Sequence, residues 1–353
     1  MKKLVSKIRE RKQPKEPVGR ITNDTLAQHR EKVLAGGRKF KYPVQYARHK
    51  LVINAAIIAV SAIILLIGVG WYLLYPAQNT SDFMYRVTRV VPVPVANVDG
   101  QPVRYSSYFM KYRSSMHYLL EKERIDLKTE DGKRQRDFIK TNSIDDAVAD
   151  AYAYKLAQEH KISVDSAEID AFIKRDRQSG NEEVSEATYA SIILDHYNWT
   201  MGEYRDVLRD KLLRQKVAYK VDDKARGIGA TIERLAAGED AALSDIAADL
   251  NKENNGTVSY TQPVWVPKDN QDSGIASAAG KLEKGQVSSA VTTPGDGYYY
   301  VKLLDKSDEQ IQYEYLFIPL TIFDDQLEKV KKDDKVKYYI TFERAEAATR
   351  EGQ

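Results

Sequence analysis

Cysteine is absent from this chain of 353 residues. Its absence excludes disulfide bonds, thiolate catalysis, cysteine-ligated metals and a lipid-modified cysteine. The sequence also lacks the HExxH, P-loop, GxSxG and Rossmann motifs, which supply metal, phosphate, acyl and dinucleotide sites. Carboxylate pairs such as Asp145-Asp146, Asp222-Asp223 and Asp324-Asp325 lie in charged contexts that are typical of solvated surface. We therefore expect no cofactor and no metal site.

The longest apolar run extends from Leu51 to Tyr75, contains no charged residue, and has Asn54 as its only strongly polar side chain. A helix needs about 20 apolar residues to cross roughly 30 Å of hydrocarbon, and in lipid a helix satisfies every backbone polar group. Trp71 and Tyr72 lie near one end, where aromatic rings favour the headgroup layer. Residues 51–75 are therefore predicted to be a transmembrane helix in contact with the lipid bilayer. A buried core helix or a cleaved signal peptide fits this length less well.

Charge is distributed unevenly on the two sides of this stretch. Residues 1–50 contain 15 Lys and Arg against 4 acidic residues, whereas 39 basic and 47 acidic residues follow Tyr75. Basic flanks stay in the cytoplasm, so we expect a single-pass protein of the cell membrane with a cytoplasmic N-terminus and extracytoplasmic C-terminal domains. Residues 1–50 are expected to be a mostly disordered basic tail, in which GGRKFKYP interrupts any helix. Because topology already explains this charge, no nucleic acid is expected as a partner.

Amphipathic helices are predicted to fill residues 82–223. A strand and an Asp99-Gly100 turn come first in RVTRVVPVPVANVDGQPV, and apolar residues then recur at helical spacing. Asp165 with Glu168, and Thr200 with Glu203, have the spacing of capping boxes, whereas TEDGKRQRDF is expected to be a loop. The aromatic helix faces either line a peptide-binding groove or are packed core.

The order of these segments carries a family resemblance. PVANVDGQPVRYSSYFMKY resembles the start of the SurA/PrsA/PpiD group of extracytoplasmic foldases, where a strand leads into the first helix. AVADAYAYKLAQEHKISVDSAEIDAFIKR resembles the second and third helices of that group, with Lys161 where the family usually has Gly, and YNWTMGEYRDVLRDKLLRQKVAYKV resembles the long helix that follows. The resemblance covers roughly residues 90–222. It implies a SurA-like helical chaperone domain at 82–223 whose partners are unfolded or newly exported polypeptides.

Residues 224–306 resemble the next module of those proteins, the parvulin prolyl-isomerase fold. Ala230–Gly238 and Leu243–Leu250 are similar to its first two helices, and IASAAGKLEKGQVSSAVTTPGDGYYYVKLLDK is similar to its closing helix, turn and strand. The opening strand of the family is missing, and we expect Ile311 to Leu320, which follows the matched residues, to pair into the same sheet and complete a parvulin-like module at 224–320. A charged C-terminal segment, residues 321–353, completes the chain.

The residues that the family uses for isomerisation are not matched. The resemblance implies two His, an Asp or Cys, and a Met and Phe that line a proline pocket. All five His lie outside residues 224–320, no Met follows Met201, and Tyr299 stands at one His position. The pocket Phe positions fall on Ile275 and Gly280. We therefore expect weak or absent peptidyl-prolyl isomerase activity and assign no catalytic residue.

Together these patterns predict an α+β protein with a single transmembrane helix, a SurA-like helical chaperone domain and a degenerate parvulin-like α+β domain. The predicted function is that of a membrane-anchored extracytoplasmic chaperone. The alternatives are an active peptidyl-prolyl cis-trans isomerase with unusual site residues and a non-catalytic membrane scaffold for a dedicated partner. The candidate peptide-binding residues are Tyr108, Tyr112, Met116, Trp265, Ile275, Tyr298 and Tyr299.

Overall fold

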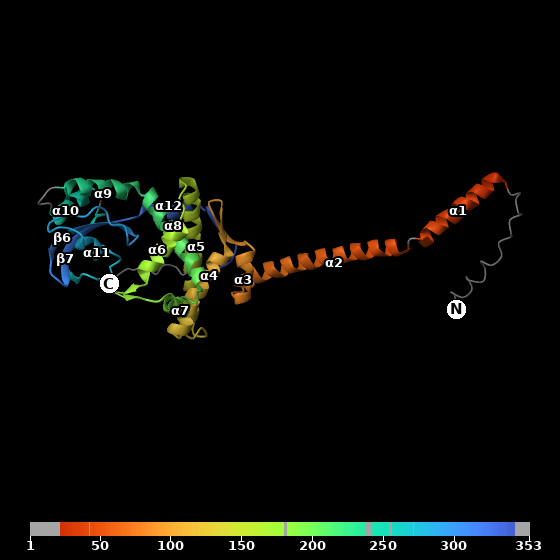
Figure 1. The fold of residues 1–353 in the computed structure, drawn as a ribbon, viewed down its shortest axis with the longest axis horizontal. Helices are drawn as coiled ribbons and strands as arrows, with labels where there is room; N and C mark the ends of the chain where they lie inside the picture. Colours follow the sequence, from red (N-terminus) through yellow and green to blue (C-terminus); the bar gives the residue numbers. More distant parts are fainter. Residues whose placement is uncertain are drawn as a thin grey trace. The chain divides into compact units, whose positions relative to one another are not determined.

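The computed structural model describes residues 22–41, 43–179, 182–237, 242–253, 256–270 and 272–342. The chain divides into two units, Met1–Leu73 and Leu74–Gln353 (Figure 1).

Apart from Thr22, the described residues of the first unit are helical. It contains α1 (Asn23–Lys41) and most of α2 (Pro43–Leu74). Within α2, the 26 residues His49–Leu74 are long and apolar enough to cross a membrane, in agreement with the stretch predicted at 51–75. The helix break predicted at Gly36-Gly37 is wrong, because α1 runs through both glycines. A glycine costs a helix only about 1 kcal/mol relative to alanine, so flanking helix formers can carry the helix through. Residues 1–21 of the predicted disordered tail lie outside the described residues.

The second unit begins with a helical part. Its helices are α3 (Asp82–Val90), α4 (Tyr105–His117), the π-helical turn η2 (Tyr118–Lys122), α5 (Glu130–His160), α6 (Ser166–Asp176), α7 (Glu186–Tyr197) and α8 (Met201–Val221). A hairpin of β1 (Pro94–Val98) and β2 (Gln101–Arg104) precedes α4, and a short pair, β3 (Gln178–Ser179) and β4 (Glu182–Glu183), precedes α7. Asp99 and Gly100 join β1 to β2 with positive φ angles of 45° and 88°, as a two-residue hairpin turn requires.

The predicted helix starts are mostly confirmed. Both capping boxes form, at Asp165 and at Thr200. The predicted loop TEDGKRQRDF is wrong, because α5 begins at Glu130. The Thr129 side chain caps this helix by accepting a hydrogen bond from the Gly132 N–H, and Gly132 packs so closely on Asp126 that a side chain would clash. Local capping thus outweighs the polar composition that favoured a loop.

The C-terminal segment returns to the helical part. After α12 (Ile322–Lys332), β8 (Val336–Tyr338) pairs antiparallel with β1, which gives a sheet of order β2-β1-β8. Val336 lies opposite Val98, and the Tyr338 hydroxyl lies 3.1 Å from an oxygen of Asp145 on α5. The segment predicted from residue 321 onward therefore completes the helical part as far as residue 342.

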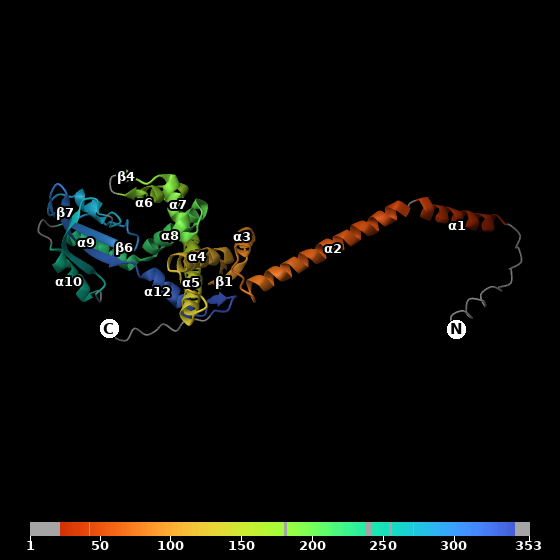
Figure 2. The same ribbon diagram turned by 90° about the horizontal axis from the view of Figure 1, so that it is seen from below.

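A three-stranded antiparallel sheet organises residues 223–320. Its strands are β5 (Ser259–Pro267), β6 (Gly297–Lys306) and β7 (Gln310–Pro319), in the order β5-β7-β6. The strand predicted at Ile311–Leu320 is thus confirmed, and it is central. Side chains alternate between the two faces of a strand. Residues such as Tyr300 and Leu316 pack under α9 (Asp223–Leu235) and α10 (Leu243–Glu253), and residues such as Tyr299 and Val301 pack under α11 (Ile275–Gly280). Figure 2 shows α9 and α10 beside the strands β6 and β7.

Candidate peptide-binding groove

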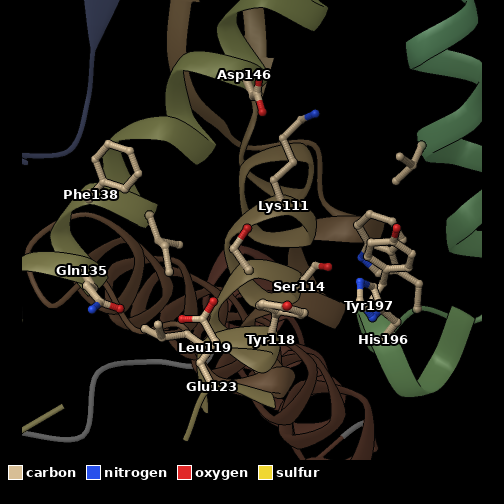
Figure 3. Close-up of a pocket in the computed structure, with 14 residues that line it drawn as sticks. Lys111, Ser114, Tyr118, Leu119, Glu123, Gln135, Phe138, Asp146, His196 and Tyr197 are labelled. Carbon is tan, nitrogen blue, oxygen red and sulfur yellow. The ribbon is translucent and has the colours of Figure 1, made fainter. Parts of the chain in front are cut away.

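An open groove lies in the helical part of the second unit. Its volume is about 670 Å³, and most of its lining surface is apolar. The lining residues come from α4, η2, α5, α7 and α8, from Glu123 directly after η2, and from the loop that joins α7 to α8. Figure 3 shows Lys111, Ser114, Tyr118, Leu119, Glu123, Gln135, Phe138, Asp146, His196 and Tyr197, and the wall also includes Ser115, Ile139, Trp199 and Val207.

Several large side chains in this groove remain open to solvent. Phe138 on α5 is 56% exposed, Tyr118 on η2 is 39% exposed, and Tyr197 at the end of α7 is 37% exposed. Phe138 lies on one side of the groove and Tyr197 on the other, with Tyr118 between them (Figure 3). Contiguous exposed apolar surface on a soluble body marks a site of interaction.

One wall of the groove is a row of aromatic rings. The His196 ring lies 5.1 Å from the ring of Tyr118 and 4.6 Å from that of Tyr197, both edge-on. Tyr197 stacks on Trp199, with the centroids 4.8 Å apart and the planes 13° apart. The Trp199 indole donates a hydrogen bond to the Met110 carbonyl. Such rings offer large apolar area with few rotatable bonds, so they can contact many different sequences.

Polar contacts fix the helices on either side of this wall. Lys122, at the end of η2, pairs with Asp195 on α7 at 2.6 Å, and this ammonium holds the pKa of the Asp195 carboxyl below its usual value. His117 contacts the Asp195 carbonyl through Nε2 at 2.9 Å. The turn η2, which follows His117 and ends at Lys122, is π-helical, and π-helical turns are frequent at functional sites.

A second cavity, of about 510 Å³, is lined mostly by polar groups from α3, α4, α5 and α8 and by the β2 hairpin. Asp150 and Asp210 line this cavity, and Asp150 pairs with Lys111 at 2.7 Å. Loss of hydration and the neighbouring Asp150 charge raise the pKa of Asp210 to about 6. Tyr154 on α5 also lines this cavity and is 47% exposed. Its polar, charged walls make it less suited to apolar segments than the groove.

The predicted binding residues of α4 are not part of the groove. Tyr108, Tyr112 and Met116 are 2%, 8% and 9% exposed. Tyr108 packs in a ring cluster with Phe109 and Tyr112, at centroid distances of 5.6 and 5.8 Å. These side chains are packed core, which the helical spacing alone could not separate from a groove.

The predicted binding residues of the sheet module do not converge either. Ile275, on α11, is buried in the same core cluster as Tyr299. Tyr298 is half-buried against Tyr219, and Trp265 is 44% exposed on β5. The Tyr299 hydroxyl donates to Asp296, and burial raises the pKa of this phenol. Tyr299 therefore stays protonated at neutral pH, where its hydroxyl can donate a hydrogen bond.

A third cavity, of about 690 Å³, lies between the helical part and the sheet module. Charged residues such as Lys211, Arg214, Asp296 and Asp324 line much of it. The apolar groove thus belongs to the helical part alone. The sequence offered two signals for it, the aromatic run of Tyr197 and Trp199 at a helix junction and the isolated Phe138. Phe138 ends the segment TEDGKRQRDF, for which the composition predicts a loop but which lies in α5 from Glu130 onward.

Comparison with known families bears on the same part of the chain. A family model described as the SurA-like N-terminal domain matches residues 45–218. The match spans every helix that lines the groove and ends before the sheet module. No curated protein and no solved structure matches the chain. This match confirms the resemblance to the SurA/PrsA/PpiD group over the helical part.

Proposed function

We propose, from the premise that this chain carries a SurA-like N-terminal domain, that it is a membrane-anchored extracytoplasmic chaperone that binds unfolded or newly exported polypeptides. The observation that carries the proposal is the open apolar groove in that domain. Phe138, Tyr118 and Tyr197 keep more than a third of their surface exposed there. Burial of such surface by a client is favourable at roughly 25 cal/mol per Å², whatever the client sequence.

The exposed apolar side chains and the charged residues at the groove suit transient binding of extended chain segments. Further apolar side chains are exposed on the two elements that carry the aromatic wall: Leu120 on η2 at 40%, and Ile192 and Leu194 on α7 at 50% and 52%. Lys111 and Glu123 add charges of both signs to the lining. The backbone of a client can form hydrogen bonds with these polar groups while its apolar side chains enter the groove.

The membrane anchor gives this binding a location. The apolar helix at His49–Leu74 supports a single span, and the 15 basic against 4 acidic residues of positions 1–50 support a cytoplasmic N-terminus. Tethering raises the local concentration of the chaperone where exported chains emerge. The proposed partners are therefore polypeptides outside the cytoplasm, with the bilayer as the support.

The sheet module at 224–320 is proposed to be a degenerate parvulin-like domain. A central strand between two edge strands, with two helices on one face and one on the other, supports this reading. Prolyl isomerisation is a second candidate function, because the donor Tyr299 lies beside the rings of Phe317 and Tyr315, at 4.6 and 5.6 Å. A proline-peptide isomerisation assay on the full chain separates the two. Turnover that Tyr299→Phe abolishes would establish the enzyme.

The chaperone proposal is tested with the full-length protein in lipid nanodiscs. We expect it to suppress aggregation of several unrelated chemically unfolded proteins. A photo-reactive residue in place of Tyr118 or Phe138 should cross-link to them, whereas the same residue in place of Tyr154, outside the groove, should not. Undiminished aggregation would instead favour a scaffold for one dedicated partner. Equal cross-linking at all three positions would refute the groove as the binding site.

A further inference from the structure

Helix α3 carries apolar side chains on both of its faces. On the inner face, Met84 and Tyr85 are only 3% and 4% exposed. On the outer face, Phe83 is 69% exposed and Val90 is 83% exposed. Helical residues seven apart lie on the same side, and the partly exposed Val87 lies between them. Phe83, Val87 and Val90 therefore form one outward strip, named here the α3 strip.

The α3 strip cannot turn inward, because the helix is fixed to the body. The Tyr85 hydroxyl donates to Glu203 on α8 at 2.6 Å, and Arg89 pairs with the same carboxylate at 3.3 Å. Asp82, at the start of α3, pairs with Arg113 on α4 at 2.6 Å. Contacts at both ends and along the inner face thus hold the orientation of the helix.

Both ends of α3 are tied to the point where the apolar helix α2 ends. On one side, only residues 75–81 separate Leu74 from the start of α3, and seven residues reach about 25 Å at most. On the other side, the Pro94 carbonyl, four residues beyond Val90, accepts a hydrogen bond of 2.6 Å from the Tyr75 hydroxyl. The α3 strip is thereby kept close to the end of the span.

We propose that α3 is an interfacial helix, and that its outward strip inserts at the boundary between headgroups and acyl chains of the extracytoplasmic leaflet. The occupant is lipid, because only residues 75–81 separate α3 from the apolar helix of the proposed span. Trp71 and Tyr72, 59% and 58% exposed near the end of that span, have the residue types of the same layer. The exposed Arg86 on the outer side of α3 suits contact with lipid phosphate.

This inference rests on the proposed membrane anchor and adds a second membrane contact to it. A single span leaves a body free to rotate about the span axis, whereas an inserted helix beside it limits that rotation. The body would then face the membrane with one fixed surface. The inference concerns lipid only and is independent of whether the groove binds clients.

The lack of cysteine makes a direct test possible, because each introduced thiol is the single one in the chain. Phe83→Cys and Val90→Cys are labelled with a nitroxide in the full-length protein, in vesicles of phosphatidylethanolamine and phosphatidylglycerol. Collision with lipid-soluble oxygen and with a water-soluble nickel complex is then measured at each label. Ile64→Cys, in the middle of the span, and Lys284→Cys, on the exposed surface of the sheet module, give the lipid and water references.

We expect the labels at positions 83 and 90 to favour oxygen over nickel, with values between the two references. Nickel accessibility equal to that at position 284 would overturn the proposal. Low accessibility to both reagents would also overturn it, because it indicates a protein partner or a second copy on the α3 strip. A label at position 64 that reports water would remove the anchor and the proposal together. Loss of client binding with lipid contact retained would refute only the chaperone function.

Discussion

Replacement of Phe138 by serine gives the sharpest test of the groove. Phe138 is 56% exposed on α5, so the protein itself gains little from this ring. Exposed substitutions away from special features usually change the free energy of unfolding by about 0.5 kcal/mol or less. Phe138→Ser should therefore leave the fold intact while it removes apolar surface that a client would cover.

The expected loss of affinity follows from the exposed area. A phenylalanine side chain offers about 200 Å², and the 56% that remains exposed corresponds to roughly 110 Å². Complete burial of this area would contribute about 2.8 kcal/mol at 25 cal/mol per Å². A client that covers half of it would contribute about 1.4 kcal/mol, so we expect the dissociation constant to rise about tenfold.

The measurement is fluorescence anisotropy of a labelled, chemically unfolded polypeptide titrated with the full-length protein in nanodiscs. Tyr154→Ser is the matched control, because Tyr154 lies on the same helix, is 47% exposed and lines the polar cavity instead. It should change the affinity less than twofold. An equal loss for the two variants, or no loss for Phe138→Ser, would refute the assignment of clients to this groove.

Two further predictions concern buried ionisable groups. Tyr85→Phe removes the 2.6 Å hydrogen bond to the buried Glu203, which should cost about 1.5–3 kcal/mol of unfolding free energy in thermal or denaturant melts. Burial opposes the charge of Glu203, but bonds from Tyr85 and Thr200 hold its pKa below the ordinary 4.5. This stabilisation is therefore lost as pH falls below that value, and the penalty of the variant should shrink there; a constant penalty would contradict the pairing. Asp210 behaves in the opposite way, because its pKa is raised from 3.8 to about 6. Its ionisation should lower stability by up to about 3 kcal/mol as pH rises between these values, and Asp210→Asn should remove that decline.

Features with a local signal could be predicted from the sequence. The apolar run predicted the long apolar helix at His49–Leu74, and the spacing of Asp165 with Glu168 and of Thr200 with Glu203 predicted two helix starts. The alternation in IQYEYLFIPL predicted a strand in the sheet. Each of these signals is read within one element, where side-chain period and capping chemistry decide the structure.

Features that depend on distant contacts could not be predicted in this way. The pairing of β8 with β1 joins residues more than 200 positions apart, and the sequence of neither strand indicates which strand it pairs with. The groove presents the same difficulty. Tyr108 and Tyr118 both occur in aromatic helical sequence, but one is 2% exposed and the other 39%. The difference arises from the neighbouring helices α5 and α7, so periodicity could identify apolar faces without showing which would be covered.

The chain enters and leaves the sheet module at neighbouring points, so the module can be removed without cutting the helices that line the groove. The buried Asp222 carboxylate accepts hydrogen bonds from the Ala225 N–H at 2.8 Å, where the chain enters the module, and from the Thr321 and Ile322 N–H groups at 2.8 and 3.2 Å, where it leaves. Because one carboxylate contacts both junctions, a short Gly-Ser link can replace residues 223–320 without strain. The groove helices and the β1–β8 pairing lie outside the excised part, so the shortened protein should fold cooperatively and bind unfolded polypeptide within about threefold of the full chain. A shortened protein that folds but no longer binds would show that the sheet module holds clients itself, and would contradict the division of roles proposed above.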